Sequence, residues 1–162
     1  GRLDAGNLAV FAGNRLVLAV PVGSPIKAAA LEDCLKALKD GRIATGDPEH
    51  VPLGKYARDA LQGEGVWDDV RSRLLPADSA GAALRLVASG QIAAGIVYAS
   101  DAKAAGLNVA FVFPPADPPI AYVAGLVSNA PAAVQFLAFL TAAEGATMLC
   151  RHGLTLPENR PC

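Results

Sequence analysis

The sequence is poor in the residues from which most catalytic and metal sites are built. Its 162 residues include two histidines, three cysteines, one tryptophan and one methionine. His50 and His152 lie far apart, and the cysteines form no Cys-x-x-Cys pair, so no zinc site is predicted. The hydrolase motifs Gly-x-Ser-x-Gly and His-Glu-x-x-His are missing as well. We therefore expect no enzyme, no cofactor and no directly bound metal cation.

The sequence also lacks a charge excess and a long apolar run. Fourteen basic and fifteen acidic residues give a formal charge of −1. No run of Lys and Arg is interleaved with aromatic residues, as a chain that follows a phosphate backbone would need. The longest apolar stretches, residues 16–22 and 120–127, are well short of the ~20 residues that span a bilayer. We expect neither nucleic-acid binding nor membrane insertion.

The odd number of cysteines leaves one thiol over if the other two form a disulfide. Cys150 with Cys162 is one such pair, and it would tie down the end of the chain. The sequence leaves the states of Cys34, Cys150 and Cys162 open. Cysteine usage alone does not settle the compartment either.

Short β-branched and apolar runs alternate with helical patterns, which predicts an α/β fold with a largely parallel sheet. The expected strands are residues 16–20, 42–44, 93–97, 109–113 and 122–127, with a very short one at 74–75. Apolar residues at helical spacing predict helices over residues 31–38, 53–61 and 80–88. A further helix over residues 132–143 is apolar nearly all round, so it requires partner surfaces on more than one side.

Three places where a helix is expected to begin have features of an anion site. In residues 46–57, Pro52 takes the first helical position, so the N–H groups of Leu53 and Gly54 have no partner inside the helix. The helix dipole favours negative charge at such an end.

The other two beginnings follow further strands. In residues 76–81, Asp78 or Ser79 can cap a helix, which leaves the N–H of Ala80 as a donor. In residues 95–101, a buried strand ends at Tyr98, just before Ser100 or Asp101 is expected to cap the next segment. Because ligands of open α/β sheets gather at the carboxyl ends of strands, the three places can form one site.

Each feature has a simpler interpretation when it is taken singly. Helices that begin with proline or with a Ser or Asp cap are common, and a tyrosine such as Tyr98 is more often a packed ring. Lys55 and Arg58 are best interpreted as solvated surface charges, and Asp47 with His50 as a turn residue beside a surface ring.

The order of these stretches resembles the molybdate-binding proteins, the solute-binding component of the molybdate ABC transporter. The stretches that carry the resemblance are Asn14-Arg15-Leu16-Val17-Leu18, Gly46-Asp47-Pro48-Glu49-His50-Val51-Pro52-Leu53-Gly54-Lys55-Tyr56-Ala57, Trp67-Asp68 and Gly95-Ile96-Val97-Tyr98-Ala99-Ser100-Asp101. The resemblance covers nearly the whole chain. It implies a periplasmic-binding-protein type II-like fold, with a three-layer α/β/α lobe, a mostly parallel sheet and part of a second lobe. Residues 14–115 are expected to form lobe two, residues 1–13 a remnant of lobe one, and residues 116–162 the crossover and the C-terminal part of lobe one.

The resemblance also implies a ligand. Molybdate or tungstate would be bound in the periplasm, or another extracytoplasmic compartment, and delivered to the membrane permease of an ABC transporter. Carried over by position, the oxyanion donors are the backbone N–H groups of Leu53 and Ala80 and the hydroxyl of Tyr98. The family can have other small or apolar residues at the first two positions, which leaves a main-chain donor unchanged.

The sequence departs from the family at its beginning. Family members carry further chain ahead of the position of Gly1, with serine-type donors that no segment here matches. The resemblance therefore implies an N-terminally truncated chain with part of the site, weak or absent ligand binding, and an exposed or self-associating apolar helix near Phe136. Two alternatives stay open: the effector domain of a transcriptional regulator, and a receptor for another oxyanion such as sulfate.

Overall fold

The computed structural model describes residues 8–26, 30–157 and 162. The chain divides into two compact units. The central unit comprises residues 15–116, and the terminal unit comprises the chain up to Asn14 and from Asp117 onward. That these units correspond to the two lobes of a binding protein stays a prediction.

The central unit is built on a mixed sheet. Its strands are β2 (Leu16–Val20), β3 (Ile43–Gly46), β4 (Leu74–Ala77), β5 (Ala94–Tyr98) and β6 (Asn108–Val112), in the order β4-β3-β5-β2-β6. Strand β3 is parallel to β4 and β5, whereas β2 is antiparallel to β5 and β6. Within this sheet only β2 runs against the other strands, so the predicted α/β sheet is found as a mixed one, with the parallel pairings confined to β4, β3 and β5.

Both faces of this sheet are covered. Val17, Ala19 and Val97 on one face pack with Ala102 of α5 (Ala99–Ala104), and Leu84 of α4 (Ala80–Ala88) packs against the same cluster. The side chains between them along β2 and β5 point the opposite way and are buried as well. A strand that is covered on both faces consists of consecutive apolar residues. This pattern made β2 predictable with its exact ends.

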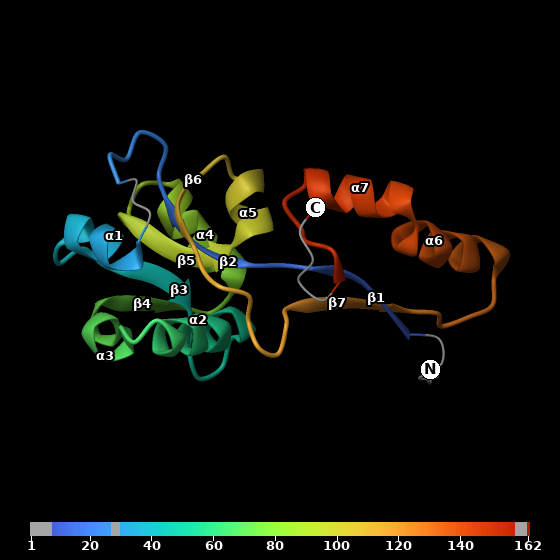
Figure 1. Cartoon of the computed structure of the whole chain (residues 1–162), viewed down its shortest axis with the longest axis horizontal. Coiled ribbons are helices and arrows are strands. Elements are labelled where there is room, and N and C mark those ends of the chain that lie inside the picture. The colour runs from blue at the N-terminus through green and yellow to red at the C-terminus, as the bar shows by residue number, and fades with distance from the viewer. Residues whose placement is uncertain (1–7, 27–29, 158–161) are drawn as a thin grey trace. The chain divides into compact units, whose positions relative to one another are not determined.

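The remaining helices of the central unit are α1 (Leu31–Leu38), α2 (Pro52–Gly63) and α3 (Trp67–Val70), followed by the short 3-10 helix η2 (Arg71–Arg73). Figure 1 shows α2 and α3 on one side of the strands and α4 and α5 on the other, which gives three layers. The helices expected from apolar spacing are confirmed in α1, α2 and α4.

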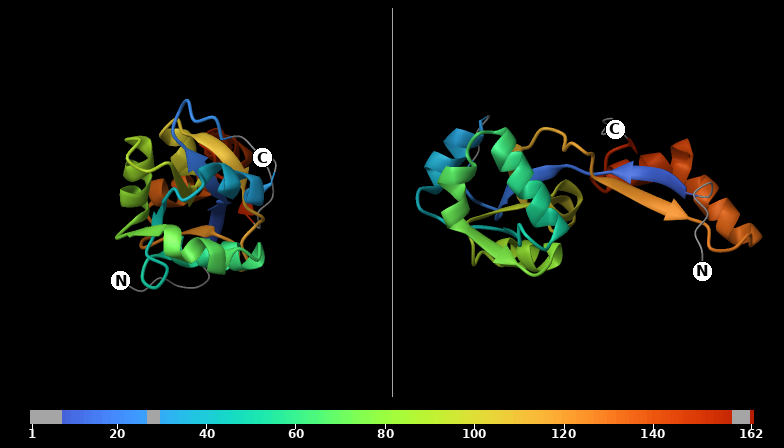
Figure 2. Two further views of the ribbon diagram at one scale, coloured as in Figure 1. Left: turned by 90° about the vertical axis from the view of Figure 1, so that its left-hand side faces the viewer. Right: turned by 90° about the horizontal axis from the view of Figure 1, so that it is seen from below.

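The terminal unit has a smaller sheet, in which β1 (Leu8–Gly13) pairs antiparallel with β7 (Ala121–Gly125). Helix α6 (Pro131–Thr141) and helix α7 (Ala143–Arg151) both contact β1 and lie on one side of the strand pair (Figures 1 and 2). The predicted helix over residues 132–143 therefore ends earlier than expected, and α7, which was not predicted, follows at a bend of 65°.

Much of the apolar surface of the terminal unit is uncovered. No described residue of α6 is buried, and Phe136 is 62% exposed. On the strands, Val10 and Val123 are paired in register and exposed as well. The expectation of an apolar surface near Phe136 is thus confirmed, whereas the packing of α6 on more than one side is not found among the described residues.

The cysteines divide between the two units. Cys150 and Cys162 form a disulfide, with their Cα atoms 5.7 Å apart, and Cys34 is a buried thiol whose Sγ lies 3.6 Å from the carbonyl oxygen of Ala110. In the described part of the chain no single helix has the length and apolar composition to cross a bilayer. Helices α6 and α7 have the required length and composition only when they are counted together across their bend.

Candidate oxyanion site

The structure brings the three predicted donors to one edge of one sheet. Strands β3, β4 and β5 are parallel neighbours, so their carboxyl ends lie along the same edge. Leu53 follows β3, Ala80 follows β4, and Tyr98 is the last residue of β5. In register, Gly46 pairs with Ala77, so β3 and β4 end level with each other. This strand order depends on long-range pairing and was not predicted.

The loop between β3 and α2 is held by Asp47. Its N–H donates to the carbonyl oxygen of Ala77 (2.9 Å), which ties the loop to the end of β4. Its Oδ1 accepts from the N–H groups of Glu49 (2.7 Å) and His50 (3.1 Å). The bond from Glu49, followed by those from His50, keeps the pKa of Asp47 below its usual value. Asp47 is thus a turn residue and His50 an exposed ring, as the simpler interpretation had it.

Helix α2 begins with two amide donors that have no acceptor. Pro52 occupies the first position, and the first amide that bonds back is that of Lys55, to the carbonyl oxygen of Val51 (3.1 Å). Within the described residues, the N–H groups of Leu53 and Gly54 form no hydrogen bond. Leu53 is only 1% exposed. An oxyanion that accepted from these amides would be stabilising, because a hydrogen bond to a charged group contributes ~1.5–3 kcal/mol.

Gly54 allows the start of α2 to press against the end of β3. A Cβ atom at this position would collide with the carbonyl oxygens of Gly46 and Asp47. Any larger residue would therefore push the helix start, and the amide of Leu53 with it, away from the edge of the sheet. Sequence reasoning noted Gly54 as a donor but not as a packing requirement.

Helix α4 begins with a side-chain cap. Ser79 is the capping residue, and its Oγ accepts from the N–H of Ala82 (3.2 Å), which decides between the two caps that the sequence left open. The N–H groups of Ala80 and Gly81 are left without an acceptor in the part of the chain that the structure describes. A second helix start on this edge thus presents main-chain donors.

The two donor-bearing helices also lack the acidic residues that commonly offset a helix dipole. Neither α2 nor α4 has Asp or Glu in its first turn, whereas α1 has Glu32 and Asp33 there and α5 has Asp101. The positive ends of α2 and α4 are therefore not compensated by their own side chains. This signal is readable in the sequence and strengthens the case for an anion.

The third junction differs from its prediction. Helix α5 begins at Ala99, directly after Tyr98, and no side chain caps it, so the expected cap by Ser100 or Asp101 is wrong. Ser100 and Asp101 lie inside the first turn of α5 and not at its capping position, and the N–H of Ala99 donates to the carbonyl oxygen of Arg15 (2.9 Å). Burial raises the pKa of Asp101. Because the first amide of α5 is used within the fold, a donor at this junction would have to come from the side chain of Tyr98, which stays a prediction.

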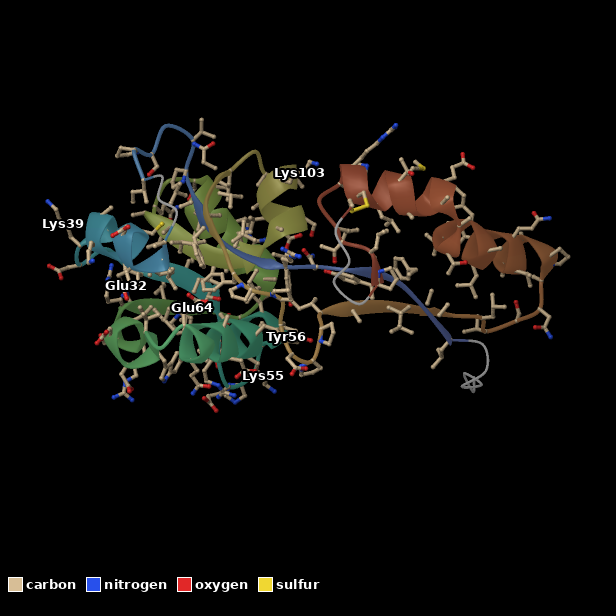
Figure 3. The ribbon with its side chains drawn as sticks, in the orientation of Figure 1. Glu32, Lys39, Lys55, Tyr56, Glu64 and Lys103 are labelled. Carbon is tan, nitrogen blue, oxygen red and sulfur yellow. A yellow bond between two sulfur atoms is a disulfide. The ribbon has the colours of Figure 1, made fainter. Side chains whose placement is uncertain are left out.

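Basic side chains near the first junction are engaged or solvated. Arg58 Nη1 lies 3.1 Å from Glu49 Oε1, and its Nε lies 3.6 Å from Asp59 Oδ1. Lys55 is exposed on α2, next to Tyr56 (Figure 3). The local attraction for an anion therefore rests mainly on oriented N–H groups.

Two hollows of the central unit lie away from these donors. One, of about 590 Å³, is lined in part by Glu32, Lys39 and Glu64, which are labelled in Figure 3. Its lining reaches Arg73, just ahead of β4, so it sits at the amino ends of the strands, opposite the donor edge. The other lies beside the end of α4. The first mixes both charge signs, and neither includes the amides of Leu53 or Ala80, so the donor edge remains the better anion site.

Comparison with known proteins assigns the chain to a family. The family model described as bacterial extracellular solute-binding protein matches residues 1–155. The chain belongs to this family. It is a family of solute-binding proteins rather than of enzymes.

Relatives of this solute-binding protein include two curated proteins named molybdate-binding protein ModA. That of Escherichia coli K12 is 36% identical over 95% of this chain and 63% of its own length. That of Haemophilus influenzae is 37% identical over 74% of this chain and 49% of its own length. The chain thus spans about half to just under two thirds of these relatives.

A solved structure supports the fold. The periplasmic molybdate-binding protein of Azotobacter vinelandii superposes with a TM-score of 0.75 at 24% identity, and the match covers 96% of this chain and 71% of that one. The expected periplasmic-binding-protein-like α/β architecture is thereby confirmed.

Proposed function

We propose that this chain supplies oxyanion donors in a molybdate- or tungstate-binding protein of the periplasm, which delivers its ligand to the membrane permease of an ABC transporter. The observation that carries the proposal is the pair of helix starts, at α2 and α4, whose first N–H groups have no acceptor among the described residues. The names of the two ModA relatives supply the ligand class.

The donors favour a fully deprotonated tetrahedral anion. The amides of Leu53 and Ala80 and the hydroxyl of Tyr98 are neutral groups that can all donate. A ligand that carried a proton would bring its own O–H to a place without an acceptor, which costs ~1–3 kcal/mol. Size then separates molybdate and tungstate from sulfate. No salt bridge to a basic side chain is required.

We further propose that the two compact units are parts of the two lobes of such a protein. The central unit is lobe two, with the donor edge, and the terminal unit belongs to lobe one. The division at Asn14 and Asp117 supports this assignment, because domains meet where few contacts cross. The alternatives of a regulator domain and of a sulfate receptor gain no support from the curated ModA relatives.

The test compares two tyrosine variants in the full-length protein that carries this chain. Tyr98→Phe removes the proposed donor and should weaken molybdate binding by about 1.5–3 kcal/mol, roughly 10- to 150-fold in Kd. Tyr56→Phe, the same change on α2, should leave the affinity unchanged. Titration calorimetry with molybdate, and with sulfate for comparison, provides the measurement. An unaltered Kd for Tyr98→Phe would remove this residue from the site, and equal affinity for sulfate would reassign the ligand.

A further inference from the structure

Three segments of the terminal unit meet at the point where the chain enters the central unit. The N–H of Gly13 donates to the carbonyl oxygen of Thr155 (2.8 Å). The N–H of Thr155 donates in return to the carbonyl oxygen of Gly13 (3.0 Å). The N–H of Asn14 donates to the carbonyl oxygen of Ile120 (3.2 Å). A Cβ atom on Gly13 would lie 2.5 Å from Thr155 Oγ1, so glycine is needed for this close approach. The last residues before the unit boundary are therefore held on two sides.

The side chain of Asn14 adds a specific bond to this main-chain framework. Asn14 is fully buried, and its Nδ2 donates to the hydroxyl of Tyr122 on β7 (3.0 Å). The ring of Tyr122 in turn lies 6.4 Å from the ring of Phe11, centroid to centroid. Phe11 sits where the register of β1 shifts between Val10 and Ala12, as at a β-bulge. A buried amide is retained only where it is bonded, so this bond fixes one arrangement of the segment.

The next residue along the chain belongs to the donor edge. Arg15 opens the central unit, and its carbonyl oxygen accepts from the N–H of Ala99, the residue after Tyr98. Leu16 also pairs in register with Tyr98. Asn14, whose side chain is bonded within the terminal unit, is thus directly followed by Arg15, whose backbone is bonded next to Tyr98, the proposed ligand donor.

We propose that Asn14 is a positioning residue, whose hydrogen bond to Tyr122 limits the rotation of the chain between the two units and so sets the range of arrangements that they adopt. Hinges consist of a few residues at the ends of elements that absorb changes in φ and ψ, and Asn14 occupies such a place between β1 and β2. That this range controls oxyanion affinity rests on the proposed function.

The test measures the arrangement of the units directly, without ligand. Two dyes are attached through azide-bearing residues at the exposed positions Lys39 and Glu144, so that the native cysteines stay intact. Single-molecule energy transfer then reports the distribution of distances between the units. Tyr122→Phe removes only the hydroxyl. It should lower the ratio of molecules with the bonded arrangement to molecules with other distances between the dyes by about 2- to 12-fold, the factor expected for one ordinary hydrogen bond. Asn14→Ala should shift it in the same direction.

Further variants separate this role from a structural one. Because Asn14→Ala already removes the bond to the Tyr122 hydroxyl, the double variant should differ little from Asn14→Ala alone. Tyr56→Phe, a matched loss of a hydroxyl in the central unit, should leave the distribution unchanged. If Asn14→Ala does not fold, Tyr122→Phe alone decides.

An unshifted distribution in Tyr122→Phe, even with a lowered unfolding midpoint, would overturn the proposal. An equal shift in Tyr56→Phe would overturn it too. A repeat with added molybdate keeps the two proposals apart. If the unmodified protein bound no molybdate, the proposed function would be refuted. The shift of the distance distribution measured without ligand would still support the role of Asn14.

Discussion

The two units bury their apolar residues to very different degrees. Of the largest side chains that are less than 2% exposed among the described residues, all but Asn14 belong to the central unit. The central sheet is enclosed on both faces, whereas the two strands of the terminal unit carry helices on one face only. A two-stranded sheet is marginal by itself. The difference indicates that the central unit can hold donors in fixed positions, while the terminal unit depends on further contacts.

The sharpest test of this difference is a pair of phenylalanine variants. Phe113, 1% exposed in the central unit, packs edge-to-face on Phe111 with ring centroids 5.2 Å apart. Phe113→Ala should lower the free energy of unfolding by about 3–5 kcal/mol. Phe136→Ala, at a 62% exposed position of the terminal unit, should change it by less than about 0.5 kcal/mol. Urea unfolding followed by far-ultraviolet circular dichroism measures both changes, because the central and the terminal unit both contain helices. Similar midpoints for both variants would remove the contrast.

The exposed face of α6 provides the second test. If the apolar surface around Phe136 drives self-association, Phe136→Glu should weaken the association by about 1.5–3 kcal/mol, the contribution of one buried large apolar side chain. Sedimentation velocity over a range of concentrations measures this. Glu144→Gln, a change at an exposed position of α7, serves as the control. A monomer at all concentrations before any substitution would show that this surface does not bind a second copy.

A glycine pair in α2 tests how tightly the donor edge is packed. Gly54→Ala places a methyl group against the carbonyl oxygens of Gly46 and Asp47, so we expect a loss of about 1–3 kcal/mol in stability. Gly63→Ala, at the end of the same helix, meets no atom within 4 Å and should stabilise the unit by about 0.5–1 kcal/mol. Both are read from urea unfolding followed by the fluorescence of Trp67, the single tryptophan. If Gly54→Ala were as harmless as Gly63→Ala, the close approach of α2 to β3 would be wrong.

The smallest effect concerns two acids at the donor edge. The pKa of Asp47 is lowered in the folded state, so ionised Asp47 stabilises the unit above its usual pKa of about 3.9, and this contribution is lost as pH falls through the lowered pKa. Burial raises the pKa of Asp101 above its usual value. The folded unit therefore loses stability as pH rises from the usual pKa through the raised one, because the buried carboxyl must then ionise. Asp47→Asn and Asp101→Asn should therefore change the pH dependence of the urea midpoint in opposite directions. Changes in the same direction would contradict the two shifts.

Local patterns were sufficient where a segment carries its own signal. Strand β2 is a continuous apolar run and α4 has a clear apolar stripe, so both were predictable, whereas the choice between Asp78 and Ser79 as the cap of α4 was not. The cap expected at Ser100 or Asp101 failed because α5 begins at Ala99, directly after β5, which places both residues inside the first turn of the helix. Strand β1 was missed because it depends on β7, more than a hundred residues away, and because its register shifts near Phe11.

The candidate site was predictable in its parts but not in its assembly. The proline at the start of α2 and the cap of α4 can be read from the sequence, and so can the missing acidic residues in their first turns. That these starts share an edge follows from the order β4-β3-β5, which long-range pairing decides. The close approach at Gly54 likewise depends on a carbonyl oxygen from another element.

The central claim is that the amides of Leu53 and Ala80 face a common oxyanion. Nuclear magnetic resonance of the ¹⁵N-labelled chain, titrated with molybdate, observes both amides individually and also detects weak binding. The account predicts saturable downfield shifts for Leu53 and Ala80, smaller shifts with sulfate, and no shift for Val66 or Arg73 at the opposite edge. Unmoved signals from Leu53 and Ala80 at saturating molybdate, or larger shifts at Val66 and Arg73, would contradict it.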